Sequence, residues 1–369
     1  MNKFLDLAAP GLKGLQPYQP GKPIDELKRE YRVNDIIKLA SNENPLGPSP
    51  MALQAMQSEF VELARYPDGN GFVLKQTIAD KLNVAQEQIT LGNGSNDILE
   101  LIARAFVTAD NEVIFSQHAF AVYPLVTQAV NAEAVVIPAT EWGHDLQAMR
   151  EAVNDRTRVI FIANPNNPTG TWLDGEALKA FIAGIPDHVI VVVDEAYFEY
   201  ANDSRMQAQG YCSAIPWLKE FPNLVVTRTF SKAYGLAALR VGYGISHPDI
   251  ADLLNRVRQP FNVNHLGLVA AAAALGDQQY LNESITMNAT GMGLLTEGFS
   301  RMGLQYIPSV ANFVSVDIGK DAAKVYDALL HEGVIVRPVA NYGMPNHIRV
   351  TIGLPEENER FLAALKKVL

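Results

Sequence analysis

The sequence has little of what marks several specialised protein classes. Its 369 residues include one cysteine, Cys212, so no disulfide can form within the chain, and a reducing compartment is the simpler expectation. The longest apolar run, residues 266–275, is about half of the roughly 20 residues that a membrane-spanning helix needs. The first residues carry Asp6 and several prolines where a secretory signal would need an unbroken apolar core. We therefore expect a soluble, cytoplasmic protein.

Charge of one sign is nowhere concentrated. The chain has 30 Lys and Arg against 40 Asp and Glu, a net charge of −10, and no run of like charge, so we expect no nucleic acid and no membrane as a partner. A small anion remains compatible, because salt screens exposed charges beyond about 10 Å and a few arginines in a cleft outweigh the distant average. With 48% apolar residues, the chain can bury a large core without stabilising disulfide bonds or metal ions.

Short apolar runs alternate with longer amphipathic segments. Strands rich in Val and Ile, buried on both faces, are predicted at residues 112–116, 134–138, 158–163, 188–194 and 223–229. Helices are predicted between most of them, at residues 96–107, 121–130, 145–153 and 174–184. This alternation predicts an α/β fold with a mainly parallel sheet, in which ligands bind at the carboxyl ends of the strands.

The two ends of the chain look different from the middle. Two helices, at about 264–275 and 277–302, precede strands at 312–318, 333–338 and 347–353 and a terminal helix. This order predicts a smaller α+β domain. The segment up to Pro45 is rich in proline, and we expect it to be irregular and to pack as an arm against that domain. The expected division is 1–45 for the arm, 46–264 for a large cofactor domain and 265–369 for the small domain.

Polar residues follow three successive predicted strands. The turn NPNNPTG, residues 164–170, follows the first, Asp194 and Tyr197 follow the second, and Lys232 and Arg240 follow the third. Taken alone, each is typical of a turn, a helix cap or a solvated lysine. Because parallel strands end at one edge of a sheet, these side chains are expected to converge there.

The set suits one kind of cofactor. A lysine amine at a protected strand end can form a Schiff base with a carbonyl compound if its pKa is lowered. A carboxylate can stabilise a protonated ring nitrogen, and Asn and Tyr can hydrogen-bond a phenolic oxygen. Arg240 with the hydroxyls of Thr229 and Ser231 offers a phosphate clamp. An aldehyde, a pyridine nitrogen, a phenolic oxygen and a phosphate together describe pyridoxal 5′-phosphate.

With the NPTG turn, D-x-x-Y, and S-K with an arginine eight residues later, the chain resembles the fold-type I aminotransferases over essentially its whole length. The resemblance implies a mainly parallel central sheet sandwiched by helices, with a smaller α+β domain. It implies that Lys232 bonds to the cofactor and that Asp194 contacts the pyridinium nitrogen. It also implies that Asn167 and Tyr197 hold the O3′ oxygen and that Arg240 binds the cofactor phosphate.

The segment GNGSND offers an anion site further upstream. A short strand ends at residues 92–94 and a helix begins near Ser95 and Asn96, which leaves backbone N–H groups free for a phosphate. A dinucleotide site is disfavoured, because Asp97 stands where the sixth position of GxGxxG needs glycine. The resemblance assigns Ser95 and Asn96 to the cofactor phosphate and Tyr123 to stacking on the cofactor ring, although Tyr123 would fit a core position equally well.

Several segments resemble one subfamily, the histidinol-phosphate aminotransferases. They are Tyr18 in PYQPGKP, the loop SNENPLGPSP, Tyr66 in RYP, Arg337 in VIVRP and Arg349 in HIRVTIG. The resemblance implies a homodimer with shared active sites, in which Tyr66 reaches the partner's cofactor phosphate. It also implies that Tyr18, Arg337 and Arg349 grip the substrate phosphate.

The resulting expectation is transamination between L-histidinol phosphate and 2-oxoglutarate, in histidine biosynthesis. Two guanidinium groups can bind a phosphate bidentately and can also hold the carboxylate of glutamate in the other half-reaction. The alternatives are an aromatic or broad-specificity amino-acid aminotransferase, a non-catalytic protein that binds pyridoxal phosphate, and a dinucleotide-dependent oxidoreductase. No metal is expected, because His118, His144 and the other histidines show no metal-ligand spacing.

Overall fold

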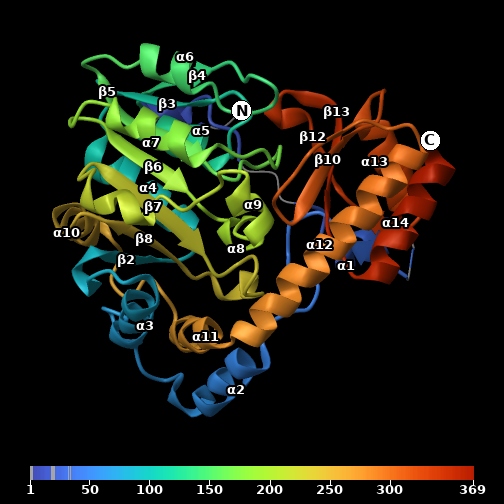
Figure 1. Cartoon of the computed structure of the whole chain (residues 1–369), viewed down its shortest axis with the longest axis horizontal. Helices are drawn as coiled ribbons and strands as arrows, with labels where there is room; N and C mark the ends of the chain where they lie inside the picture. Colours follow the sequence, from blue (N-terminus) through green and yellow to red (C-terminus); the bar gives the residue numbers. More distant parts are fainter. Residues whose placement is uncertain (1–2, 18–20, 32, 34) are drawn as a thin grey trace.

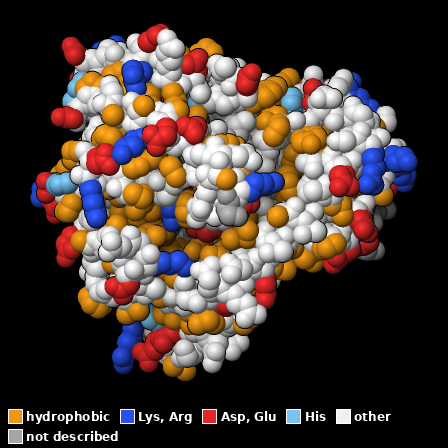
Figure 2. All heavy atoms as spheres, in the orientation of Figure 1, with side chains coloured by type: hydrophobic (Ala, Val, Ile, Leu, Met, Phe, Trp, Pro, Cys, Tyr) orange, Lys and Arg blue, Asp and Glu red, His pale blue; other side chains and the backbone are white. Residues whose placement is uncertain are grey.

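The computed structural model describes residues 3–17, 21–31, 33 and 35–369. The chain forms two lobes (Figure 1), a large lobe built on a seven-stranded sheet and a small lobe built on a four-stranded sheet. The long helix α12 (Gln278–Arg301) runs from one lobe to the other (Figure 1). Acidic and basic side chains are scattered over the face shown in Figure 2.

The large sheet is mainly parallel, as predicted. Its strands, in spatial order, are β2 (Ile89–Gly92), β8 (Gly242–Ser246), β7 (Leu224–Thr229), β6 (Ile190–Asp194), β5 (Thr157–Ala163), β3 (Glu112–Ser116) and β4 (Glu133–Ile137). Only β8 runs against its neighbours. The prediction of a fully buried strand is wrong for residues 134–138, because β4 lies at the sheet edge and leaves Val136 49% exposed.

Helices cover both faces of this sheet. One face packs against α2 (Pro50–Ser58), α3 (Phe72–Leu82), α6 (Leu146–Glu151), α7 (Gly175–Ala183) and α11 (His265–Gly276). The other packs against α4 (Ser95–Phe106), α5 (Val122–Ala129) and α10 (Pro248–Val257). Successive strand residues serve opposite faces, so Ile160 and Ile162 join one core and Phe161 the other. Two short helices, α8 (Phe198–Ala201) and α9 (Ser204–Ala208), follow β6.

The small lobe combines both ends of the chain. Its antiparallel sheet has the order β12 (Arg337–Val339), β13 (Met344–Thr351), β10 (Phe313–Asp317) and β9 (Tyr306–Ile307). A separate parallel pair joins β1 (Ile37–Lys38) to β11 (Val334–Ile335). The remaining helices are α1 (Ile24–Tyr31), α13 (Ala322–His331) and α14 (Pro355–Val368).

Two predictions for the small lobe need correction. The segment 333–338 is not one strand, because the chain leaves the β1–β11 pair before it enters the four-stranded sheet at Arg337. The N-terminal segment is not wholly irregular, because α1 buries Leu27 against Ala40, Leu330 and Ile335. An amphipathic helix thus fits between the prolines.

We propose the two lobes as domains, with the arm at 1–45 as expected and the division between 46–264 and 265–369 moved toward the C-terminus. Leu268 and Leu275 of α11 pack in the core of the large lobe, which favours placing the second boundary after α11. In the part of the chain that the structure describes, no helix is long and apolar enough to cross a membrane. The same residues contain no group of three or more His, Cys, Asp or Glu side chains placed to hold a metal ion.

Candidate functional site

A cavity lies where the carboxyl ends of β5, β6 and β7 face the small lobe. The predicted site residues that line it are Ser95, Asn96, Asn167, Asp194, Tyr197, Thr229, Ser231, Lys232, Arg240, Arg337 and Arg349. They come from segments far apart in the sequence, and the parallel strand order brings the three predicted strand ends together. The site is therefore one continuous pocket with contributions from both lobes.

Asp194 is the last residue of β6 and lies at the floor of this cavity. Its Oδ1 accepts a hydrogen bond from Thr227 Oγ1 at 3.0 Å and its Oδ2 accepts one from Tyr123 OH at 3.0 Å. Burial raises the pKa of Asp194 to about 6, and the two hydrogen bonds act in the opposite direction. The carboxyl group is thus mostly ionised at neutral pH and fixed in orientation, which suits a partner for a protonated ring nitrogen.

Tyr197 follows β6 and points its hydroxyl toward the NPNNPTG turn. The phenol oxygen accepts hydrogen bonds from Asn167 Nδ2 at 3.2 Å and from Asn42 Nδ2 at 2.9 Å. Burial raises the pKa of Tyr197 above its ordinary value, so the hydroxyl stays protonated and can donate. Asn42 was not predicted as a site residue. Its loop was noted only as a motif, and no local pattern connects it to a tyrosine 155 residues later.

Lys232 projects into the cavity from the loop after β7. Its Nζ donates to the carbonyl oxygen of Ser41 at 3.2 Å and lies 5.6 Å from the centre of the Tyr197 ring. Burial and the positive charge of Arg349 lower the pKa of Lys232 to about 7. A substantial fraction of this amine is therefore neutral at neutral pH, as a nucleophile must be.

The predicted phosphate corner lies at the N-terminus of α4. Arg240 NH1 donates to Ser231 Oγ at 3.2 Å and to the Ala237 carbonyl at 3.1 Å. A Cβ atom on Gly94, which has a φ of +84°, would lie 2.3 Å from Arg240 NH2, so glycine is needed for the arginine to approach the helix start. Thr229 Oγ1 accepts from the backbone N–H of Ser231 at 3.1 Å and orders the same loop.

Arg337 and Arg349 face the cavity from the small lobe. They are direct cross-strand neighbours on β12 and β13 and are 8% and 6% exposed. Arg349 donates to the Ala40 carbonyl at 2.9 Å and to Asn167 Oδ1 at 2.5 Å, and the bond to Asn167 ties the small lobe to the large one. Two buried like charges side by side favour binding of an anion with more than one oxygen.

The predicted stacking role of Tyr123 does not fit its position. Tyr123 is fully buried, lies parallel to Phe161 with ring centres 4.7 Å apart, and donates its hydroxyl hydrogen to Asp194. The aromatic side chain of this segment that lines the cavity is Phe120. Phe120 lies just before α5 and Tyr123 in its first turn, joined by a hydrogen bond from the Tyr123 N–H to the Phe120 carbonyl, and the sequence alone did not separate them.

The predicted site residue Tyr66 does not line this cavity. Tyr66 is 83% exposed and stacks on Phe261 with ring centres 4.8 Å apart. A surface position is what a contribution to a second subunit requires. Tyr18 lies outside the described residues, so its predicted role stays a prediction.

The donor set of the large lobe fits pyridoxal phosphate. One corner holds an arginine, two hydroxyls and a helix start for a phosphate, and the floor holds a carboxylate. Between them lie an amine with a lowered pKa and a pair of hydroxyl and amide groups, Tyr197 and Asn167, for a phenolic oxygen.

Known proteins match this chain along nearly its whole length. The model of the family described as aminotransferase class I and II matches residues 34–365. A protein named histidinol-phosphate aminotransferase 2 from Pseudomonas fluorescens strain Pf-5 is 61% identical over 99% of this chain and 98% of its own. A protein of the same name from Pseudomonas aeruginosa is 58% identical over 100% of this chain and 99% of its own.

A solved structure is also similar. The crystal structure of histidinol-phosphate aminotransferase from Sinorhizobium meliloti, in complex with pyridoxal 5′-phosphate, superposes with a TM-score of 0.89. It is 31% identical in sequence and covers 98% of this chain and 97% of its own. The likeness therefore includes both lobes.

Proposed function

Since the chain belongs to the class I and II aminotransferase family, we propose that it transfers an amino group between L-histidinol phosphate and 2-oxoglutarate, with pyridoxal 5′-phosphate as cofactor. In the reverse sense, glutamate aminates imidazole-acetol phosphate. This reaction belongs to histidine biosynthesis and supports our expectation of a cytoplasmic enzyme. The names of the close relatives support the same substrate.

The residues of the large lobe bind and orient the cofactor. Bound pyridoxal phosphate supplies an electron sink for the electron pair left when the substrate Cα loses its proton. Lys232, whose amine is partly neutral at neutral pH, would bond to the cofactor aldehyde with loss of water and, as the free amine, would move a proton between substrate Cα and cofactor C4′. Asp194, held by Thr227 and Tyr123, keeps the ring nitrogen protonated.

The remaining side chains fix the position of the cofactor. Asn167 and Tyr197 hydrogen-bond its phenolic oxygen. Ser95, Asn96, Thr229, Ser231 and Arg240 hold its phosphate, with the free N–H groups at the start of α4 adding to the anion site. Together these residues would hold the cofactor at both its phosphate and its ring.

The arginine pair of β12 and β13 is the observation that favours histidinol phosphate as the substrate. Arg337 and Arg349 sit at the other end of the cavity from the cofactor phosphate corner, buried and adjacent. An amino-acid carboxylate has two oxygens, whereas a phosphate monoester has three and about twice the charge, so two buried guanidinium forks suit the phosphate better. The same pair can hold the carboxylate of glutamate in the second half-reaction.

A substrate panel tests this proposal. Purified holoenzyme with 2-oxoglutarate is compared on histidinol phosphate, phenylalanine, tyrosine and aspartate, by kcat/KM. We expect histidinol phosphate to exceed the others by at least about 100-fold, the worth of two charge-assisted contacts. Equal or higher values for the aromatic amino acids would instead establish the aromatic or broad-specificity aminotransferase.

We also propose a homodimer with shared active sites, in which Tyr66 reaches the partner's cofactor phosphate. Exposed apolar side chains around Tyr66 support it, since a monomer would leave them in water. They are Leu46, Met51, Leu53, Phe60, Val61, Leu63, Phe72, Val73 and Phe261. Sedimentation at micromolar concentration should give twice the mass of the chain, and a monomer that is fully active would exclude the shared site.

A further inference from the structure

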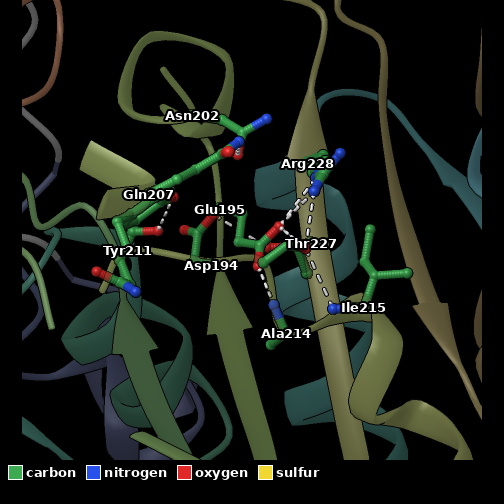
Figure 3. Close-up of polar contacts among 11 residues, drawn as sticks. Asp194, Glu195, Asn202, Gln207, Tyr211, Ala214, Ile215, Thr227 and Arg228 are labelled. Carbon is green, nitrogen blue, oxygen red and sulfur yellow. Dashed lines mark hydrogen bonds and ion pairs between the residues drawn. The ribbon is translucent and has the colours of Figure 1, made fainter. Parts of the chain in front are cut away.

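A buried ion pair lies next to Asp194, the residue proposed to contact the ring nitrogen of the cofactor. Glu195 follows Asp194 at the end of β6, and Arg228 follows Thr227 on β7. Glu195 Oε2 accepts hydrogen bonds from Arg228 Nε at 2.9 Å and NH2 at 2.7 Å. Figure 3 shows the two side chains reaching toward each other across the strand ends. This pair has no part in the proposed function above.

The pair is almost completely enclosed and every oxygen of the carboxylate is used. Glu195 is 1% exposed and Arg228 is 4% exposed. The backbone N–H of Ala214 donates to Glu195 Oε1 at 2.6 Å, and Ser213 Oγ donates to Oε2 at 2.9 Å. The guanidinium of Arg228 lies 3.6 Å from the centre of the Phe198 ring. Neither side chain can change rotamer without leaving a buried charge unsatisfied.

These contacts fasten the strand ends on the face opposite the cavity. Successive side chains of a strand point to opposite faces, so the Thr227–Asp194 hydrogen bond lies on one face and the Arg228–Glu195 pair on the other. The backbone N–H of Glu195 also donates to the Thr227 carbonyl at 2.9 Å. Asp194 and the adjacent Glu195 are therefore held by three links to one neighbouring strand.

The same pair touches the segments that carry the other reacting groups. Arg228 is four residues before Lys232, and Phe198, on which its guanidinium rests, is the residue after Tyr197. A shift of Arg228 would move both segments together with Asp194. Stability alone does not account for such a pair, because well-packed apolar residues in place of a buried ion pair are often neutral or stabilising.

We propose that Glu195 and Arg228 are positioning residues of the proposed transamination, which hold the Asp194 carboxylate at a fixed place relative to Lys232. The inference rests on the proposed function for the identity of the reaction only. Arg228 has a second task, because the charge of Glu195 raises the pKa of Asp194 and a buried cation beside Glu195 opposes that effect. The other ionisable groups that interact with Arg228 are Glu199, Lys81, Tyr211, Tyr234 and Tyr243.

The test uses three variants of the holoenzyme. Arg228→Met leaves the Glu195 charge unbalanced, and the double variant Glu195→Gln/Arg228→Met removes both charges while Gln can still accept from Ala214. Arg228→Lys keeps the positive charge but loses the paired guanidinium donors that bind Glu195 Oε2. The readouts are kcat and KM, the cofactor dissociation constant of the apoenzyme, and the pH midpoint of the visible absorbance of bound cofactor.

We expect Arg228→Met to lower kcat about 10- to 100-fold at unchanged KM, since a misplaced reacting group costs rate rather than substrate affinity. Its absorbance midpoint should move to higher pH, because an unbalanced carboxylate favours the protonated form. In the double variant the midpoint should return toward that of the parent enzyme while kcat stays low. Arg228→Lys should recover part of kcat.

Asn223→Ala is the matched control. Asn223 is buried and its Nδ2 donates to the Val189 carbonyl at 2.8 Å, so it links the same two strands at their opposite end. It should leave kcat and the midpoint unchanged. If the double variant folds with the kcat and midpoint of the parent enzyme, the pair is only structural and the proposal is overturned. Should the substrate panel fail, the midpoint and the cofactor affinity still decide this question.

Discussion

The cavity has two anion sites, and they are built in different ways. The Arg240 site lies wholly within the large lobe, and its parts come from two short segments that pack beside each other, residues 92–96 and 229–240. The Arg337–Arg349 site lies on two strands of the small lobe and contacts the large lobe through Asn167. Within one chain, the first site is formed by one lobe alone, whereas the geometry of the second depends on how the lobes meet. We infer that the large-lobe end serves every substrate and that the small-lobe end chooses among them.

The largest effect is expected from Lys232→Ala, which removes the reacting amine from the large-lobe end of the cavity. Lys232→Ala should abolish steady-state turnover with every amino donor, because it deletes both the bond to the cofactor and the proton carrier. Initial rates and the visible spectrum of the purified protein measure this. Lys179→Ala, which breaks only a surface ion pair with Glu220, is the control. Turnover near the parent value in Lys232→Ala would remove the central assumption of the mechanism.

A slightly smaller loss is expected when the floor carboxylate is neutralised. Asp194→Asn keeps the shape of the side chain but cannot keep the ring nitrogen protonated, so kcat should fall about 100- to 1,000-fold for all donors alike. The cofactor should remain bound, as measured by its absorbance after gel filtration. A loss confined to histidinol phosphate would contradict the division between the two ends of the cavity.

Arg337→Ala is expected to weaken only the anion site at the small-lobe end of the cavity. Loss of its charge-assisted contacts should lower kcat/KM for histidinol phosphate about 10- to 100-fold and leave kcat/KM for phenylalanine within a few-fold. The ratio of the two values is the measurement. An equal loss for both substrates would show that Arg337 supports the fold or the cofactor rather than selecting a substrate.

One small-lobe residue is expected to act on the large-lobe end. Since burial and Arg349 lower the pKa of Lys232 to about 7, cofactor capture by the apoenzyme should speed up as pH rises through about 7, where the amine becomes neutral. Arg349→Gln removes a positive charge, so the pKa of Lys232 rises, the midpoint moves to higher pH, and capture at pH 7 slows about two- to tenfold.

Stopped-flow absorbance over a pH series measures that midpoint. Arg360→Gln, which breaks an ion pair with Asp35 on the outside of the small lobe, is the matched control and should leave the midpoint in place. A midpoint that stays unchanged in Arg349→Gln would mean that the two ends of the cavity are electrostatically independent.

The smallest effect is expected at Tyr66. Tyr66→Phe keeps the ring on Phe261 but removes the hydroxyl proposed to reach the partner's cofactor phosphate, so the cofactor dissociation constant should rise a few-fold, the worth of one hydrogen bond. Fluorescence titration of the apoenzyme measures it. An unchanged constant would assign the large-lobe anion site to Arg240 and its neighbours in one subunit alone.

The same contrast explains what the sequence could predict. Asp194, Tyr197 and Lys232 stand at the ends of apolar runs, so strand prediction and the rule for parallel sheets were enough to bring them together. The alternation of apolar and amphipathic segments also predicted the mainly parallel sheet, and it gave the ends of most helices to within a residue or two. Segments whose structure is decided by their own residues were predicted well.

What depends on distant contacts was not predictable. Nothing near Asn42 indicates that it donates to Tyr197, and nothing near Arg337 and Arg349 fixes them as cross-strand neighbours. Phe120 and Tyr123 are both aromatic and only three residues apart, so only packing against Phe161 decides which faces the cavity. The exposure of β4 depends on its place at the sheet edge, which its Val-rich sequence does not reveal.

The pairing of β1 with β11 sets an order for events on the ribosome. Ile37 must wait for Val334 before it can pair, and at about 5–20 residues per second that delay is roughly 15–60 s. All strands of the large sheet are complete by Ser246, so the cofactor half of the pocket can form while the small lobe is still being made. The nascent chain would thus be able to hold its cofactor before it can discriminate a substrate.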